Sequence, residues 1–201
     1  MKVFGLTGGV GMGKSTVEQL LRQRGLPVVD TDTLARQIVE PGQPALQEIL
    51  RTFGPRVVDE AGRLRREELA RIVFPDPAAR QQLESITHPR IRDLWMRQVE
   101  TWRAGQQPVA VVVIPLLFET SAEKNMNVTV CVACSKAVQQ QRLKERGWSA
   151  DQIRQRIAAQ WPIEKKVARS DFVIWTEGQP EILRKQLDRI FNAAPATTTA
   201  S

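Results

Sequence analysis

Five short runs of apolar, mostly β-branched residues recur along the chain and predict strands. The runs lie at 3–6, 27–29, 109–114, 128–132 and 172–175. The third run is apolar without interruption, which is typical of a parallel strand covered on both faces. Because helical stretches separate the runs, right-handed β-α-β crossovers are expected. The pattern therefore predicts an α/β fold in three layers, with a parallel five-stranded sheet between helices.

The stretches between these runs carry signals for the ends of helices. Helices are predicted at 14–24, 135–146, 149–159 and 181–191. Gly25 follows the first of these and suits a helix C-terminus. Ser135 is a candidate N-cap, and Ser149 with Gln152 three residues later has the pattern of a capping box.

The spacing of the strands predicts two insertions in the core. The interval before the third strand is far longer than one crossover helix needs. Proline breaks such as His88-Pro89 divide it, so residues 40–107 are predicted to form a helical subdomain. Residues 140–168 are predicted to form a second helical insertion. The core then comprises 1–39, 108–139 and 169–192, and residues 193–201 are predicted to be a disordered tail.

Composition excludes several classes of protein. The longest apolar run is about half of the ~20 residues that span a bilayer, and no signal-peptide cleavage site follows the N-terminus, so a cytoplasmic location is expected. The 29 basic and 22 acidic residues give a net charge of +7, which suits a polyanionic ligand. Tyrosine is absent and no dense basic run occurs, so a nucleic-acid surface is not expected.

The glycine-rich segment after the first strand is the strongest chemical signal. Gly8-Gly9-Val10-Gly11-Met12-Gly13-Lys14-Ser15 matches the phosphate-binding loop G-x-x-x-x-G-K-[ST] at every defined position. Backbone N–H groups of such a loop surround an anion, and the following helix adds about +0.5 charge at its N-terminus. Lys14 is expected on the β- and γ-phosphates of ATP, Ser15 on Mg²⁺ and Thr16 on the α-phosphate.

The loop by itself does not identify a reaction. No guanine-reading Asn-Lys-x-Asp occurs, and a Pro, not an Asp-Glu pair, follows the third strand, which favours a kinase over GTPases and mechanical ATPases. Asp30 and Asp32 follow the second strand, where ligands of α/β sheets bind. One carboxylate could accept a proton and the other could organise Mg²⁺ through water. Alternatively, Asp32 caps a helix beginning near Thr33.

Two further pairs of residues have competing interpretations. Arg142 and Arg146 share one face of a helix and could clamp a phosphoryl group or the adenine ring, or could form a solvated face. Cys131 and Cys134 form a C-x-x-C, but a zinc site needs about four ligands and His88 is the one histidine. A pair of buried structural cysteines is the preferred interpretation.

Taken together, the residues resemble the dephospho-CoA kinase family. The order and spacing of many short segments carry the resemblance across about residues 3–178. These segments are Leu6 to Thr16, Val29 to Arg36, Glu40-Pro41-Gly42, Phe53-Gly54, Val73-Phe74, Leu83-Glu84, His88-Pro89, Pro115 to Glu119, Gln141-Arg142-Leu143 with Arg146, Arg156 to Gln160 and Ser170 to Ile174.

The resemblance implies an activity and roles for particular residues. It implies transfer of the γ-phosphoryl group of ATP to the ribose 3′-hydroxyl of dephospho-CoA, with 40–107 holding the CoA substrate and 140–168 acting as a lid. Asp32 would be the general base, and Lys14 and Arg142 would contact the phosphates. The nucleotide would be bound by Gly8, Gly9, Gly11, Met12, Gly13, Lys14, Ser15, Thr16, Arg142 and Arg146. The acceptor would be bound by Thr7, Asp32, Arg36, His88, Leu116 and Glu119.

The chain also departs from the family pattern at three places. Leu64-Arg65-Arg66 stands where Leu-Asp-Arg is common, and Asn127 stands where Asp is common before the fourth strand. Trp175-Thr176-Glu177-Gly178 replaces Asp-Asn-x-Gly, which leaves the nucleotide contacts of this late loop open. For His88, a helix cap before Pro89 is an alternative to a role at the acceptor.

Other functions stay open at this point. The chain could phosphorylate a different small molecule, such as a nucleoside or a shikimate-like alcohol. It could also be an ATP-dependent switch that binds nucleic acid, which its charge allows. A small-molecule substrate, no membrane and a monomer or small homo-oligomer are expected.

Overall fold

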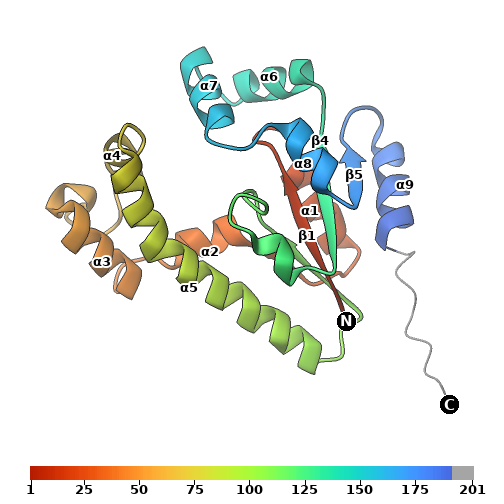
Figure 1. Cartoon of the computed structure of the whole chain (residues 1–201), viewed down its shortest axis with the longest axis horizontal. Coiled ribbons are helices and arrows are strands. Elements are labelled where there is room, and N and C mark those ends of the chain that lie inside the picture. Colours follow the sequence, from red (N-terminus) through yellow and green to blue (C-terminus); the bar gives the residue numbers. More distant parts are fainter. Residues whose placement is uncertain (192–201) are drawn as a thin grey trace. The chain divides into compact units, whose positions relative to one another are not determined.

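The computed structural model of the protein describes residues 1–191 and contains a five-stranded sheet (Figure 1). The strand order is β2-β3-β1-β4-β5, and β1 pairs in parallel with both β3 and β4, as β4 does with β5. The strands are β1 (Lys2–Gly8), β2 (Val28–Asp30), β3 (Val109–Val113), β4 (Val128–Ala133) and β5 (Phe172–Trp175). The predicted fold class is confirmed. The predicted tail at 193–201 lies outside the described residues.

Helices connect these strands, and the chain as a whole divides into two compact units. The first unit comprises Met1–Val29 and the chain from Thr101 onward, and the second comprises Asp30–Glu100. The α-helices are α1 (Lys14–Gln23), α2 (Thr31–Gln37), α3 (Pro44–Phe53), α4 (Arg66–Val73), α5 (Pro77–Ala104), α6 (Lys136–Glu145), α7 (Ala150–Ala158), α8 (Ile163–Arg169) and α9 (Pro180–Phe191), with 3-10 turns η1 (Pro55–Val57) and η2 (Ala122–Asn125).

Helices cover both faces of the sheet in the first unit. Successive residues of a strand point to opposite faces, and one face carries a core that includes Phe4 and Leu6 of β1 with side chains from α1 and α9. The alternate positions of β1, Gly5 and Thr7, lie on the other face, where α8 packs against β1 and β4. Three layers therefore form around β1, and the loop that follows β1 emerges from the centre of the sheet.

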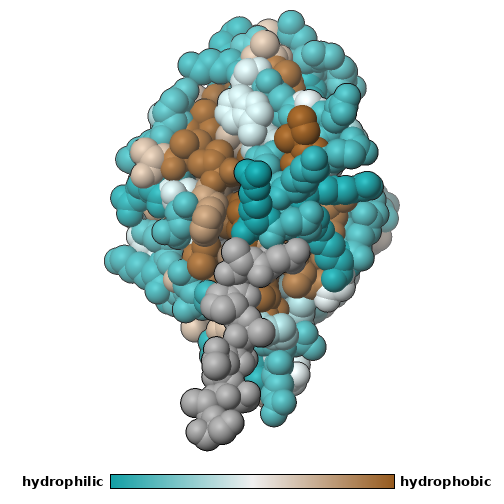
Figure 2. All heavy atoms as spheres, turned by 90° about the vertical axis from the view of Figure 1, so that its right-hand side faces the viewer, coloured by the Kyte–Doolittle hydropathy of each residue, from teal (hydrophilic) through white to brown (hydrophobic). Residues whose placement is uncertain are grey.

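Strand β5 forms one edge of the sheet and exposes large apolar side chains. Phe172 and Trp175 of β5 are exposed, as is Ile182 of α9. The side that carries β5 and α9 in Figure 1 shows hydrophobic patches in Figure 2. The Gln186 side chain of α9 accepts a hydrogen bond from Trp175 N–H and donates one to Trp175 C=O, both at 2.9 Å. This amide satisfies two backbone groups that an open edge would otherwise offer to another chain.

The second unit has its own apolar cluster, formed by helices α2 to α5. Ile38, Ile49 and Ile86 are among its buried members. The predicted break at His88-Pro89 is wrong, because α5 continues through Pro89. Proline removes one N–H from the helical ladder, but apolar residues on both sides of Pro89 hold the helix to its cluster. The Arg90 guanidinium also donates to Ile86 C=O within the helix, at 2.6 Å.

Candidate functional site

The predicted phosphate loop joins β1 to α1 in the structure, and its glycines are required by close packing. A Cβ atom on Gly8, which has φ +148°, would lie 2.3 Å from Val132 C=O of β4. Gly13 has φ +89°, and a Cβ there would lie 3.0 Å from Thr176 Oγ1 and 3.2 Å from an Arg142 nitrogen. Only glycine permits both the backbone conformation and the close approach.

The Lys14 side chain folds back onto the loop that precedes it. Its Nζ donates to Gly8 C=O at 2.7 Å and to Gly9 C=O at 2.9 Å. Gly13 is the N-cap of α1 without a side-chain cap, so the first N–H groups of this helix have no side-chain acceptor at the cap. Ser15 and Thr16 are exposed in the first turn. The arrangement can bind a phosphate chain through amides, an ammonium group and hydroxyls.

Two glutamines that sequence reasoning missed hold the loop at Val10. Gln160 Oε1 accepts from Val10 N–H at 3.0 Å, and Gln139 Nε2 donates to Val10 C=O at 2.8 Å. Gln139 belongs to α6 and is buried, whereas Gln160 follows α7. Both backbone groups of one loop residue are thus satisfied by side chains more than 120 positions away in the sequence.

Arg142 is bound to the late loop that departs from the family pattern. Its two terminal nitrogens donate to Thr176 Oγ1 at 2.9 Å and to Thr176 C=O at 2.8 Å. Thr176 Oγ1 in turn donates to Met12 C=O at 2.9 Å. The structure therefore brings Arg142 beside the phosphate loop, as its nearness to Gly13 also shows. Arg146 is exposed at the C-cap of α6.

Glu177 fixes the beginning of the helix that carries Arg142. Its carboxylate accepts from Ser135 N–H, and Ser135 is the N-cap of α6, as predicted. Hydrogen bonds from Ser135 and, more weakly, the charge of Arg142 lower the pKa of Glu177 below its ordinary value. The predicted capping box at Ser149 is likewise present in α7.

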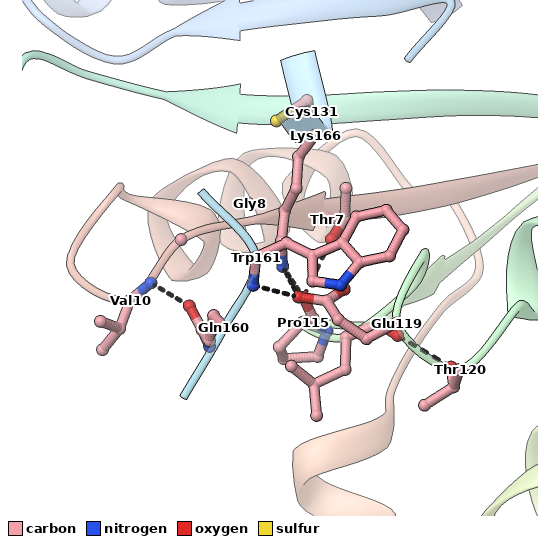
Figure 3. Close-up of polar contacts among 12 residues, drawn as sticks. Thr7, Gly8, Val10, Pro115, Glu119, Thr120, Cys131, Gln160, Trp161 and Lys166 are labelled. Atoms are coloured by element: carbon pink, nitrogen blue, oxygen red, sulfur yellow. Dashed lines mark hydrogen bonds and ion pairs between the residues drawn. The ribbon is translucent and has the colours of Figure 1, made fainter. Parts of the chain in front are cut away.

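A buried ion pair lies near the phosphate loop, between Lys166 and Glu119 (Figure 3). Lys166 of α8 is completely buried, and its Nζ donates to Pro115 C=O at 2.7 Å and pairs with Glu119 Oε1 at 2.8 Å. Thr7 Oγ1 donates to the same Pro115 carbonyl at 3.0 Å. Leu116, predicted at the acceptor, is half-buried and accepts from the Thr120 hydroxyl through its carbonyl. Sequence reasoning missed Lys166.

Asp30 and Asp32 stand at the start of α2, and the structure separates their roles. The N-cap is Asp30, whose carboxylate accepts from Asp32 N–H at 3.0 Å and from Thr33 Oγ1 at 3.4 Å. The alternative interpretation, in which Asp32 caps the helix, is therefore wrong. Asp32 is exposed in the first turn. Its carboxylate remains a candidate general base.

The predicted acceptor residues Arg36 and His88 belong to the second unit. Arg36 is exposed in the last turn of α2, and His88 is half-buried inside α5, so it does not cap a helix. Burial lowers the pKa of Arg66, and the neighbouring charge of Arg36 lowers it further. Two guanidinium groups thus repel one another here, and an anionic ligand would relieve the repulsion. Arg66 was not among the predicted site residues.

The two cysteines lie inside the protein and are not paired with each other. Cys131 and Cys134 are buried free thiols, as predicted, and burial raises the pKa of Cys131 to about 11. Residues 1–191 contain no cluster of three side chains of the kinds that hold a metal ion. Mg²⁺ usually binds through phosphate oxygens, waters and one or two protein oxygens.

Comparison with known proteins identifies the family of the chain. The model of the CoaE family, dephospho-CoA kinase, matches residues 2–181. The dephospho-CoA kinase of Anaeromyxobacter dehalogenans is 49% identical over 94% of this chain and 90% of its own length. That of Bdellovibrio bacteriovorus is 40% identical over 94% of both chains.

Solved structures agree with this fold. The crystal structure of TT1252 from Thermus thermophilus has a TM-score of 0.85 and 36% identity, and the match covers 97% of this chain and 98% of that one. Dephospho-CoA kinase from Campylobacter jejuni has a TM-score of 0.69 at 24% identity, covering 94% and 95%. The phosphate loop, the surrounding side chains and the match along nearly the whole described chain lead to one conclusion: the chain belongs to the dephospho-CoA kinase family.

Proposed function

We propose that this protein transfers the γ-phosphoryl group of ATP to the ribose 3′-hydroxyl of dephospho-CoA, which yields coenzyme A and ADP in the last step of coenzyme A synthesis. The observation that carries the proposal is the family match over residues 2–181. This range includes the phosphate loop and the whole compact unit Asp30–Glu100. No helix in the described part of the chain has the length and apolar character needed to cross a membrane. We place the reaction in the cytoplasm.

The nucleotide side of the proposed reaction rests on the phosphate loop. In this proposal the loop amides and Lys14 bind the β- and γ-phosphates, and Thr16 binds the α-phosphate. Lys14 has to exchange its contacts with the Gly8 and Gly9 carbonyls for phosphate oxygens. Phosphoryl transfer needs mainly positioning and charge neutralisation from a protein. Arg142 is bound to Thr176 beside the loop, and this location supports the proposal that Arg142 neutralises charge on the transferring phosphoryl group.

Mg²⁺ is the proposed metal, held by the Ser15 hydroxyl and, through water, by Asp30. When bound, the ion would neutralise negative charge on the phosphates. Ser15 is exposed in the first turn of α1. Asp30 keeps its carboxylate at the start of α2 by accepting from Asp32 N–H.

Asp32 is the proposed general base, which accepts the proton of the attacking 3′-hydroxyl. Its exposure leaves the carboxylate accessible to a substrate. We propose that residues 40–107 hold the acceptor and that 140–168 form a lid that excludes water. The proposed acceptor residues are Thr7, Arg36, His88, Leu116 and Glu119. Arg36 with its neighbour Arg66 offers positive charge to a phosphate-rich ligand.

A panel of acceptors assayed by ADP release tests the proposal. Purified protein with MgATP should phosphorylate dephospho-CoA in preference to nucleosides, nucleotides and shikimate. Mass spectrometry of the product should show one added phosphate, and nuclear magnetic resonance should place it on the ribose 3′ position. Preference for another acceptor, or ATP consumption stimulated by nucleic acid, would reject the proposed function. Size-exclusion chromatography would test the expected monomer or small homo-oligomer.

A further inference from the structure

The completely buried ammonium of Lys166 is unusual among the described residues. It is the one charged side chain among the fully buried residues of this part of the chain. A buried charge is strongly unfavourable unless it is paired and hydrogen-bonded. Lys165, its neighbour, is exposed and lies over the Trp161 ring. The helix therefore directs one lysine into the protein and the other to the surface.

The partners of Lys166 connect three segments around the phosphate loop. Pro115 C=O receives hydrogen bonds from both Lys166 and Thr7, so it joins the loop after β3 to the end of β1. Glu119 Oε1 receives both the Lys166 ammonium and the Trp161 N–H, the latter at 2.9 Å. Glu119 Oε2 is buried and has no hydrogen-bond partner among residues 1–191. The single oxygen Oε1 therefore holds both donors (Figure 3).

Trp161 directly follows the glutamine that holds the loop. The Gln160 side chain accepts a hydrogen bond from Val10 N–H through Oε1. The backbone N–H of the following residue, Trp161, donates to the Glu119 carboxylate. Figure 3 shows both contacts made by one short stretch of chain between α7 and α8. If the Glu119 carboxylate moved away, Trp161 N–H would lose its acceptor. The backbone beside Gln160 would then be less well fixed, and so would the contact of Gln160 with the loop.

We propose that Lys166 is a positioning residue for phosphoryl transfer, which sets the phosphate loop through Glu119, Trp161 and Gln160. Because Lys166 is completely buried, its proposed role is to position other groups and not to contact the substrates itself. Its ammonium group holds the Glu119 carboxylate in place, and this carboxylate holds the segment that binds Val10. The inference rests on the proposed kinase function. It adds a role for a buried residue that the phosphate-loop motif does not contain.

A double-mutant cycle tests the connection. Lys166→Met should lower kcat by about tenfold to 100-fold, the range expected when reacting groups are misplaced by up to an ångström. KM for ATP should change less, because Lys14 and the loop amides remain. Gln160→Ala should lower kcat, while its free energy of unfolding in urea should fall only by about 1 kcal/mol, the contribution of the one hydrogen bond that it loses. The double variant should be no slower than Lys166→Met alone, because both changes break one connection. Lys185→Met, on an exposed lysine of α9, should match the wild type.

Several results would overturn the inference. Losses in kcat that multiply in the double variant would show that Lys166 does not act through Gln160. A wild-type rate per folded molecule for Lys166→Met would exclude any positioning role. If Lys166→Met does not fold, a wild-type kcat for Gln160→Ala alone rejects the connection.

A second readout separates this inference from the proposed function. The slow hydrolysis of ATP without an acceptor depends on the nucleotide site and not on the identity of the acceptor. If the wild type does not phosphorylate dephospho-CoA, the proposed function fails. The double-mutant cycle of Lys166→Met and Gln160→Ala can then be repeated with the rate of ATP hydrolysis as the readout. Its result still supports or rejects the positioning role of Lys166.

Discussion

Thr176 offers the sharpest test of how the nucleotide site is organised. In Thr176→Val the side chain keeps its shape but loses the hydroxyl that accepts from Arg142 at 2.9 Å and donates to Met12 C=O at 2.9 Å. The Thr176 backbone carbonyl still accepts from Arg142 at 2.8 Å. The substitution therefore loosens Arg142 without removing it from the loop.

The magnitude follows from the two lost hydrogen bonds. A hydrogen bond from a charged donor contributes about 1.5–3 kcal/mol, and a neutral one about 1 kcal/mol. Because Thr176 is half-buried, we take the lower end for the charged bond. The free energy of unfolding should fall by about 2.5 kcal/mol in total. If the oriented guanidinium contacts the phosphates, the share of about 1.5 kcal/mol from the charged bond corresponds to slightly more than tenfold weaker ATP binding.

Calorimetric titration with MgATP and urea denaturation measure the two effects separately. Thr176→Ser retains the hydroxyl and should bind ATP like the wild type, which makes it the matched control. If Thr176→Val is destabilised but binds ATP with wild-type affinity, Thr176 does not orient Arg142 for the nucleotide. Tighter binding in Thr176→Val would mean that Thr176 holds Arg142 away from the phosphates, which reverses the reasoning.

Three other substitutions test separate parts of the proposed site. Asp32→Asn should lower kcat by about 10²- to 10⁴-fold while ATP still binds, as expected for loss of a general base, and near-normal turnover would remove Asp32 from this role. Lys14→Ala should weaken ATP binding and lower kcat together, because the phosphate charge is no longer compensated; unchanged values in both assays would contradict its assignment. Gly8→Ala should lower the free energy of unfolding by at least about 2 kcal/mol in urea, since its Cβ would lie 2.3 Å from Val132 C=O, and a wild-type midpoint would show that the loop moves aside.

The sequence predicts the parts of this protein that local patterns control. All five strands form near their predicted positions because each corresponds to a short run of mostly apolar residues. The serine caps of α6 and α7 form because capping depends on residues only a few positions apart. Pro89 shows the limit of local reasoning: its preference for ending a helix is outweighed by burial of the α5 residues on either side.

Lys166 could have been found by a more careful use of the helical period. In α8 the apolar positions Ile163 and Val167 are four apart, and Lys166 lies three residues after the first of them. Lys166 therefore falls on the apolar face of the helix, whereas Lys165 does not. A lysine on such a face indicates a buried partner. The partner itself, Glu119, is 47 positions away in the sequence, and only the fold reveals it.

The sequence motif specifies which groups can bind phosphate, but the conformation of the loop depends on the rest of the first unit. Val10 is held by Gln139 and Gln160, and Met12 C=O by Thr176, through contacts that span 129, 150 and 164 positions. A glycine-rich segment is flexible by itself because glycine restricts the backbone least. These three contacts replace that freedom with a defined geometry. Changes in the late loop or in the segment between α7 and α8 should therefore affect catalysis even where they leave every residue of the motif unchanged.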